Sequence, residues 1–420
     1  MRGWLTVGLL LLVPVLSAGK DKDGDRATAL KKGIAAGLGE LAKWCGEQKL
    51  NAEGRGLCDE ALGLEPGNAG LSALKEKMAG ESAADEGAKK EYEAKLATYG
   101  KKLAPLYVEL SKQNHPSKDD AVHDGYLVRA YELEPKLVGP VIDAEWRGAQ
   151  GKKDWERAHR LITGAERVKS DPGRAKMVKE IELKCAEKAP VLKQATGRDN
   201  YYWMVLPKGW TPAKKWPVVV YVEGAGCNFL GAIRNFADNQ RSDFNCIVIT
   251  PQSISSTNDL IEQKAKYSYD VGLLEKFNAD TLGRLKFDEE GLLQFLADVR
   301  KEYNAEDRIY ITGFSGGGNL TWRMVFGHPE KLWGAAPACP NFSNSLDLST
   351  APERETLPVR VFQGDKDQYI ETLLEPAWVK AKGICDANGW KNVSREMIPG
   401  VGHSTCWDKV VPFFKSIPKK

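Results

Sequence analysis

The chain has 420 residues, of which 42% are hydrophobic and 28% charged, and its formal net charge is +3 at pH 7. This length allows two or three domains, and the composition is that of a globular protein, which excludes a disordered chain. Nucleic-acid and membrane-surface partners usually select strongly basic faces, so the small net charge implies neither.

The first residues have the pattern of an export signal. Arg2 supplies a basic start, Leu5–Leu16 forms an apolar core, and Ser17–Gly19 offers small residues for cleavage. The apolar core is about a dozen residues long, too short to span a bilayer. We therefore expect residues 1–19 to be a signal peptide and the protein to be secreted or periplasmic, with no membrane span.

Export would place the eight cysteines in an oxidising compartment, where disulfides form. No two of them are spaced as Cys-x-x-Cys, so the sequence contains no zinc or thioredoxin-type motif of that kind. Proximity along the chain suggests two local disulfides, Cys45 with Cys58 and Cys385 with Cys406.

Residues 20–192 have the pattern of an all-α domain. Apolar residues recur at three- and four-residue spacing in Ala29–Trp44, Ala94–Leu110 and Trp155–Val168. The stretch Ala61–Pro66 recurs in similar form as Ala130–Pro135, close to two periods of the tetratricopeptide repeat of about 34 residues. We expect either a tetratricopeptide-like array or an irregular helical domain, which would dock a protein partner or cover the active site.

The pattern changes near residue 195, and residues 195–420 alternate strands with helices. The expected strands are Tyr201–Pro207, which alternates like an edge strand, and the buried runs Trp216–Val222, Cys246–Pro251 and Pro358–Phe362. Leu292–Tyr303 has the spacing of an amphipathic helix. This alternation predicts an α/β fold whose site lies beyond the carboxyl ends of the strands.

A turn around a serine is the most informative signal in this half. Arg308–Thr312 reads as a buried strand, Gly313–Gly317 has the form Gly-x-Ser-x-Gly, and Asn319–Phe326 has helical spacing. Strand, glycine-flanked serine and helix together are the context of a nucleophile elbow. Ser315 is therefore the candidate nucleophile, and the amide of Gly316, at the start of a helix, is a candidate oxyanion donor.

A serine nucleophile needs a base and an acid that orients the base. Downstream of Ser315, His403 in a glycine-rich loop is the candidate base, whereas His328 is expected to end the elbow helix. Asp365 and Asp367 both follow the strand that should carry the acid. We favour Asp367, with Asp365 forming the turn, and the order Ser, Asp, His is that of an α/β-hydrolase.

A second oxyanion donor is expected in the loop after the strand Val218–Val222. The residues there are Glu223–Asn228, and small side chains let the backbone approach a substrate closely. The amide of Ala225 is our candidate.

With these residues in place, the half from about residue 198 to 420 resembles secreted α/β-hydrolase esterases of the poly(3-hydroxybutyrate) depolymerase and feruloyl esterase type. Asp307–Gly318 matches that group's elbow, Gln363–Asp367 is similar to its His-Gly-x-x-Asp acid loop, and Gly402–His403 to its terminal base. The sequence departs from the group at Glu223 and Gln363, where histidine is usual. Glu223 either replaces the histidine by hydrogen-bonding the loop, which we favour, or opposes an oxyanion through its charge.

The resemblance implies an α/β-hydrolase fold and a secreted serine esterase that forms an acyl-enzyme without a metal or organic cofactor. Its substrate would be a small-molecule or polymeric ester, contacted by aromatic side chains near the motifs: Phe314, Trp322, Tyr369 and Trp407. One alternative is a serine peptidase of the prolyl-oligopeptidase kind, which shares the order of the three residues. The other is a binding protein whose hydrolase half has lost activity.

Overall fold

The computed structural model describes residues 22–80, 82–84, 86–113, 120–240, 244–343 and 347–419. The chain divides into two compact units, Met1–Ile181 and Glu182–Lys420, and each has its own hydrophobic core. The second unit thus starts earlier than residue 195, where the sequence suggested the change. The expected signal peptide, residues 1–19, lies outside the described residues, so export stays a prediction.

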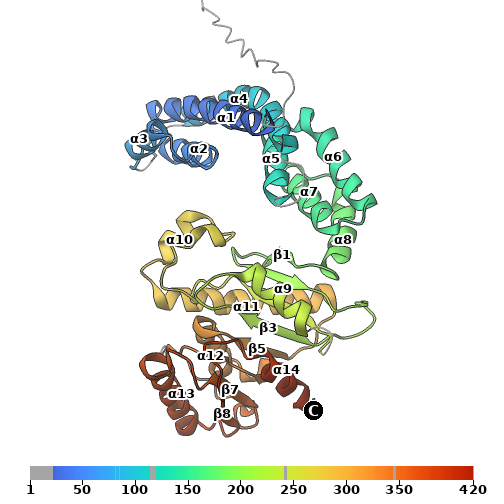
Figure 1. Cartoon of the computed structure of the whole chain (residues 1–420), viewed down its shortest axis with the longest axis vertical. Helices are drawn as coiled ribbons and strands as arrows, with labels where there is room; N and C mark the ends of the chain where they lie inside the picture. The colour runs from blue at the N-terminus through green and yellow to red at the C-terminus, as the bar shows by residue number, and fades with distance from the viewer. Residues whose placement is uncertain are drawn as a thin grey trace, which may run out of the picture. The chain divides into compact units, whose positions relative to one another are not determined.

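The first unit is built from helices (Figure 1). They are α1 (Lys22–Glu47), α2 (Asn51–Leu64), α3 (Ala69–Lys77), α4 (Glu86–Gln113), α5 (Asp120–Leu133), α6 (Pro135–Gly151), α7 (Trp155–Val168) and α8 (Pro172–Ala186), whose last residues continue into the second unit. Consecutive helices pack in pairs, α1 with α2, α4 with α5 and α6 with α7. Buried residues in α1 lie one or two turns apart, as Ile34, Leu38, Leu41 and Cys45 show. The apolar residues that recur every three or four positions in the sequence therefore form the face of the helix that packs into this core.

The helix lengths do not support a tetratricopeptide-like array. The two similar stretches of sequence do occupy equivalent places, because α2 and α5 end within them and Ala61 and Ala130 are both fully buried. However, α1 has 26 residues and α4 has 28, so each helix is almost as long as a whole repeat of about 34 residues. The shared sequence marks a common helix ending.

The second unit is built on one eight-stranded sheet. Its strands are β1 (Val191–Gln194), β2 (Tyr201–Val205), β3 (Val218–Val222), β4 (Ile247–Pro251), β5 (Ile309–Gly313), β6 (Leu332–Ala335), β7 (Val359–Gly364) and β8 (Val393–Ile398). The order across the sheet is β1-β2-β4-β3-β5-β6-β7-β8. β2 runs antiparallel to β1 and β4, and the pairs from β4 onward are parallel. This is the α/β-hydrolase fold that the sequence predicted.

The central strands are buried on both faces, as their β-branched sequences require. Every residue of β3, β4 and β5 is buried. Val219 and Tyr221 of β3 pack into a cluster with α9 (Phe229–Gln240) and α14 (Trp407–Ser416). Side chains alternate along a strand, so Val218, Val220 and Val222 face the opposite side. The other helices of the unit are α10 (Val271–Phe277), α11 (Thr281–Tyr303), α12 (Gly318–Gly327) and α13 (Glu375–Asn388).

Three strands were not predicted: β1, β6 and β8. β1 pairs with β2, so the segment at Tyr201 is an interior strand and not the edge. A strand of four residues is too short to show a period in the sequence. β1 is also the reason why the sheet unit begins before residue 195.

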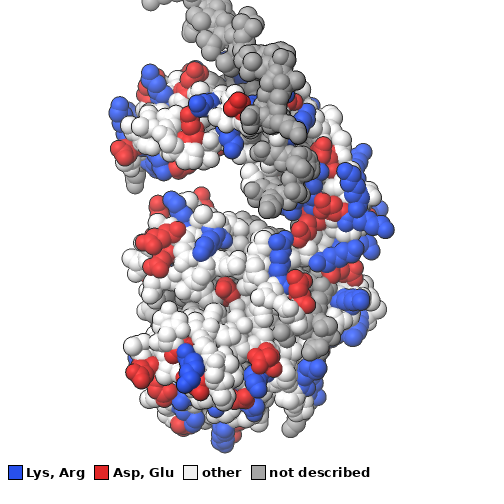
Figure 2. Space-filling model, in the orientation of Figure 1, with Lys and Arg blue, Asp and Glu red and all other residues white. Residues whose placement is uncertain are grey.

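The surface carries both signs of charge. Figure 2 shows Lys and Arg interspersed with Asp and Glu over the visible face of each unit. Among the helices in the described part of the chain, none combines the length and the apolar character needed to cross a membrane.

Candidate active site

Ser315 lies at the sharp turn between β5 and α12. Its φ is +51°, in the left-handed region that side chains other than glycine seldom adopt. The Ser315 amide donates to the Ala338 carbonyl at 3.1 Å, and the Asn341 amide donates to the Ser315 carbonyl at 2.9 Å. These bonds tie the turn to the segment after β6 and offset the cost of the strained conformation.

The glycines of this turn are required by close packing. A Cβ on Gly316 would lie 2.0 Å from the Ser256 carbonyl oxygen, and one on Gly317 would lie 2.2 Å from the Val222 carbonyl oxygen. Any larger residue would push the turn away from the ends of β3 and β4. The glycines therefore fix Ser315 above the carboxyl ends of the central strands.

His403 and Asp367 meet in the loops that follow β8 and β7. His403 Nδ1 donates to Asp367 Oδ2 at 2.6 Å, and the Tyr369 amide donates to Asp367 Oδ1 at 2.9 Å. The Asp367 side chain has no exposed surface. This carboxylate is therefore held by two donors and sets which ring nitrogen of His403 carries the proton.

Asp365, the other candidate acid, has a different role. Its Oδ1 accepts from the Gly400 amide at 2.6 Å, and its own amide donates to the Ile398 carbonyl at 3.0 Å. Asp365 thereby pins the start of the loop that carries His403. Gln363, the second departure from the resembling group, is buried, and its side-chain amide has no hydrogen-bond partner among the described residues.

The surroundings of His403 favour its protonated form. Burial alone lowers the pKa of His403, but hydrogen bonds to Cys339 and Asp367, and the charges of both, outweigh it and raise the pKa above the ordinary 6.5. The ring also contacts Phe314, with centroids 4.7 Å apart, and Tyr369, edge-on at 5.0 Å.

Ser315 and His403 belong to the same cluster, since Phe314 precedes one and packs on the other. Among the described residues no hydrogen bond joins the Ser315 hydroxyl to His403. Such contacts are often long without substrate and tighten in the complex. His328 is elsewhere: its Nε2 lies 2.9 Å from Glu289 Oε1 at the end of α12, as expected of a packing residue.

The two candidate oxyanion donors are neighbours. The Ala225 nitrogen lies 3.4 Å from the point where a Cβ on Gly316 would stand. Among the described residues, the Ala225 amide donates no hydrogen bond, and Ala225 is exposed. Its carbonyl accepts from Gln263 Nε2 at 2.7 Å, which holds the loop. An amide without a hydrogen-bond acceptor among the described residues, close to Gly316, is free to donate to a ligand there.

Glu223 bonds back into its own strand. The Tyr221 hydroxyl donates to Glu223 Oε2 at 2.5 Å, and Tyr221 is buried against Phe236 and Trp407. Burial raises the pKa of Glu223, although hydrogen bonds from Tyr221 and the Gly224 amide oppose this. The Glu223 carboxyl group is thus bound to Tyr221 and carries charge less readily than an exposed glutamate.

Asp288 of α11, which the sequence analysis did not single out, supports the Ser315 turn. The fully buried Asp288 carboxylate accepts from Ser253 Oγ at 2.6 Å and from the amides of Ile254 and Ser255 at 3.1 and 2.8 Å. Burial raises its pKa to about 6, against these hydrogen bonds. The loop it holds includes Ser256, whose carbonyl packs on Gly316. The sequence pattern of an amphipathic helix does not show that one of its aspartates binds a distant loop.

The expected disulfides are not present. All eight cysteines are buried free thiols, so Cys45 with Cys58 and Cys385 with Cys406 were wrong as pairs. Proximity in sequence does not decide which way side chains point within packed helices. Cys339 instead lies beside Asp367 and His403. Its sulfur, a carboxylate oxygen of Asp367 and a ring nitrogen of His403 all lie within 4.8 Å of one another.

The four aromatic candidates separate into two kinds. Trp322 is buried against Phe326, and Trp407 is buried against Tyr221. Phe314 and Tyr369 contact His403, and Tyr369 is 43% exposed. Of the four candidates, Phe314 and Tyr369 are thus the two that adjoin His403.

No protein-family model and no curated protein matches the sequence. A solved thermostable esterase is 23% identical, with a TM-score of 0.36, over 55% of this chain and 61% of its own length. A ferulic acid esterase from Anaeromyces mucronatus is 14% identical, with a TM-score of 0.38, over 55% of this chain and 90% of that one. An S-formylglutathione hydrolase from Agrobacterium tumefaciens is 15% identical, with a TM-score of 0.36, over 54% and 92%. Such weak likenesses identify neither the substrate nor the site residues.

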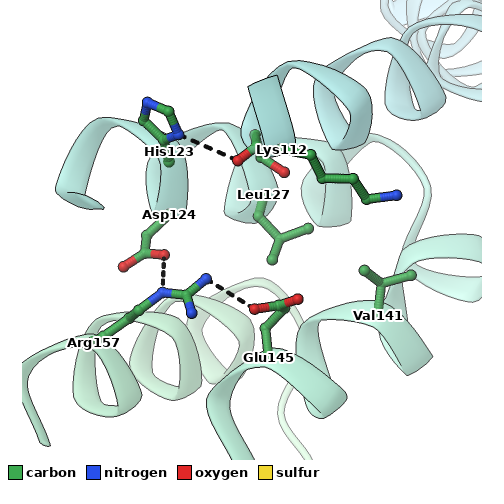
Figure 3. Close-up of a pocket in the computed structure, with 8 residues that line it drawn as sticks. Lys112, His123, Asp124, Leu127, Val141, Glu145 and Arg157 are labelled. Carbon is green, nitrogen blue, oxygen red and sulfur yellow. Dashed lines mark hydrogen bonds and ion pairs between the residues drawn. The ribbon is translucent and has the colours of Figure 1, made fainter. Parts of the chain in front are cut away.

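The helical unit contains a separate cavity of about 100 Å³ (Figure 3). In its wall Asp124 accepts from Arg157 at 3.0 Å, and Glu145 accepts from Arg157 at 2.9 Å. Asp124 also accepts from Arg160, outside the lining, at 3.1 Å. These charges are paired across α5, α6 and α7. The cluster therefore serves to hold the three helices together, as buried charges must be compensated.

Proposed function

We propose that this chain is a serine hydrolase that cleaves carboxylic esters through Ser315, His403 and Asp367. The observation that carries the proposal is the 2.6 Å hydrogen bond between His403 and Asp367 in loops that converge with the strained Ser315 turn. A nucleophile, a base and a group that orients the base are the minimum for acyl transfer.

In this proposal the Ser315 hydroxyl attacks the ester carbonyl carbon while His403 Nε2 takes its proton. Asp367 stabilises the resulting imidazolium, and the amides of Gly316 and Ala225 donate to the oxyanion. The alcohol leaves with the proton from His403. Water, deprotonated by the same ring, then releases the acid from the acyl-enzyme.

The proposed substrate is an ester with an apolar or aromatic part. Beside His403, the exposed ring of Tyr369 is followed by Leu373 and Val379, which are 40% and 60% exposed. A shallow depression next to them is lined mostly by the apolar atoms of Ile370, Pro376 and Val379 and the stems of neighbouring charged residues. Apolar surface next to a site favours a substrate that covers it.

A fluorophosphonate probe tests the nucleophile directly. We expect one covalent adduct per chain, located in the tryptic peptide Ile309–Arg323, in which Ser315 is the one serine. A panel of acetyl, butyryl and feruloyl esters and a proline p-nitroanilide, run in parallel, separates an esterase from a peptidase. Absence of labelling together with absence of turnover would contradict the proposal and favour a binding protein.

Glu223→Gln distinguishes the two interpretations of Glu223. Glutamine can still accept from Tyr221, so if the side chain only holds the loop, kcat should change by less than about threefold. If its charge opposes the oxyanion, kcat should rise about tenfold or more, and steady-state kinetics at pH 7 decides between them.

The same variant has a predicted effect on stability. A pKa raised by folding means that the folded state prefers the protonated acid, so Glu223 contributes stability below its unfolded pKa that is lost as pH rises through the folded pKa. Glu223→Gln removes this loss, and the variant should be at least as stable as wild type at pH 7 in urea unfolding.

A chain that begins at Glu182 should keep its activity on small esters. Every proposed site residue lies in the second unit, and this start retains Glu182, which binds Lys193 of β1 at 3.0 Å. We expect kcat/KM for p-nitrophenyl acetate within about threefold of the full chain. A folded but inactive fragment, judged by circular dichroism, would show that the helical unit contributes to the site.

A further inference from the structure

Two cysteines adjoin the proposed catalytic residues from opposite sides. Cys339 follows Ala338, whose carbonyl holds the Ser315 amide, and Cys406 lies three residues after His403. Their sulfur atoms lie 3.5 Å and 3.3 Å from the same carbonyl oxygen, that of Ser404. The two thiols therefore face each other across one backbone group, although the residues are far apart in sequence.

Both cysteines also have unusual backbones. The φ angle is +44° at Cys339 and +52° at Cys406, in the left-handed region that costs free energy for any residue with a side chain. Both side chains are buried, at 0% and 2% exposure, under the loop that carries His403. The fold holds the pair in place at a cost, as it does at Ser315.

We propose that Cys339 and Cys406 are an oxidative modification site, where a reversible disulfide ties the His403 loop to the Ser315 turn and frees His403 to act as a base. The bond itself is independent of the proposed function, whereas its effect on turnover rests on that function.

A disulfide fits this site better than a metal ion. Cys339, Asp367 and His403 have the ligand types of a zinc site, but both oxygens of Asp367 already accept hydrogen bonds and its side chain is fully buried. A cation held by all three residues would have to share an Asp367 oxygen that already accepts a hydrogen bond. A disulfide needs no additional atoms and only removes two hydrogens.

The charges around His403 explain why a Cys339–Cys406 disulfide would change its protonation. Hydrogen bonding from Cys406, followed by that from His403, outweighs burial and lowers the pKa of Cys339, while the same contact raises the pKa of Cys406. The reduced pair therefore favours a thiolate at Cys339, beside His403. The other groups facing the ring are Asp367, Tyr369 and the Ser315 turn. The thiolate favours the imidazolium, which cannot take the Ser315 proton.

A peroxide is the oxidant class that suits a buried pair. The Cys339 thiolate attacks one peroxide oxygen, the O–O bond breaks, and hydroxide leaves, so Cys339 becomes a sulfenic acid. The Cys406 sulfur then attacks the sulfenic sulfur, the S–S bond forms, and the hydroxyl leaves as water with the thiol proton. Two thiols lose two electrons in all, and one hydrogen peroxide becomes two waters.

The first test is a peptide map of the intact wild-type chain. After hydrogen peroxide, acid quenching and alkylation in urea, we expect a cross-link between tryptic peptides Leu332–Arg354 and Glu396–Lys409, which dithiothreitol removes. Cys385→Ser is the matched control, because this buried thiol lies outside the pair, and it should keep the cross-link. A cross-link of Cys406 to Cys385, no cross-link at all, or zinc that stays bound after gel filtration and protects the thiols from alkylation would overturn the proposal.

The second test follows kcat/KM against pH in both redox states. Oxidation should move the acid limb to lower pH and raise kcat/KM severalfold at pH 6, with the plateau unchanged. Cys339→Ser, which removes the bond and the thiolate, should behave like oxidised wild type at any redox state. Cys406→Ser removes the disulfide but keeps a hydroxyl that can donate to Cys339 in place of the thiol, so it should behave like reduced wild type. A cross-link with identical pH profiles would overturn the effect on His403, whereas a cross-link without probe labelling in either state would overturn the proposed function instead.

Discussion

Ser315→Ala is expected to lower kcat/KM for p-nitrophenyl acetate by about 10⁴-fold or more and to abolish fluorophosphonate labelling. The reason is that the substitution removes the attacking oxygen while leaving the fold unchanged. Alanine has the same left-handed strain at φ +51° as serine, so the turn should keep its geometry and stability. Activity and thermal unfolding are measured on the same preparations.

Ser394→Ala is the matched control for this prediction. Ser394 is an exposed serine of β8 in the same unit and is outside the proposed site. It should retain both labelling and turnover. Turnover by Ser315→Ala above a few per cent of wild type, with intact folding, would mean that another residue is the nucleophile.

Asp367→Asn is expected to lower kcat by about 10⁴-fold. Asparagine can fill the same space, but it offers His403 Nδ1 either an amide donor or a neutral acceptor, so neither the tautomer nor the imidazolium is stabilised. Because KM reports ground-state contacts that Asp367 does not make, it should change little.

Asp365→Asn tests whether Asp365 only supports the loop, whereas Asp367 orients His403. The Asp365 Oδ1 accepts from the Gly400 amide, and an asparagine oxygen can replace it. We expect kcat within about tenfold of wild type and a small loss in thermal stability. The reverse pattern, with Asp365→Asn inactive and Asp367→Asn active, would exchange the roles of the two aspartates.

In the second unit, the strands and the turn that are encoded by short continuous segments could be predicted from the sequence. β3, β4 and β5 are β-branched runs whose full burial follows from their composition. The turn at Ser315 is defined by a strand, glycines and a helix within a single continuous segment, which is why the sequence predicted the turn between β5 and α12. The helical unit was likewise predicted from its periodicity, but helix length separated it from the tetratricopeptide repeat.

The contacts among the loops were decided by tertiary structure alone. The sequence left Asp365 and Asp367 open because both follow β7, and only the packing of the β7 and β8 loops brings Asp367 to His403 and Asp365 to Gly400. The same applies to Glu223, whose bond to Tyr221 depends on the face of β3 that both side chains share.

What the sequence determined by itself was the alternation of strands and helices in the second unit and the strand, turn and helix around Ser315, because such elements are encoded by neighbouring residues. What only the tertiary structure decided was which distant side chains meet. The cysteines show the reason: pairing by proximity in sequence was wrong, and Cys339 instead faces Cys406 across the Ser404 carbonyl. Whether two side chains that are distant in sequence come into contact depends on the direction in which each loop leaves the sheet. That direction is set by packing against the whole core.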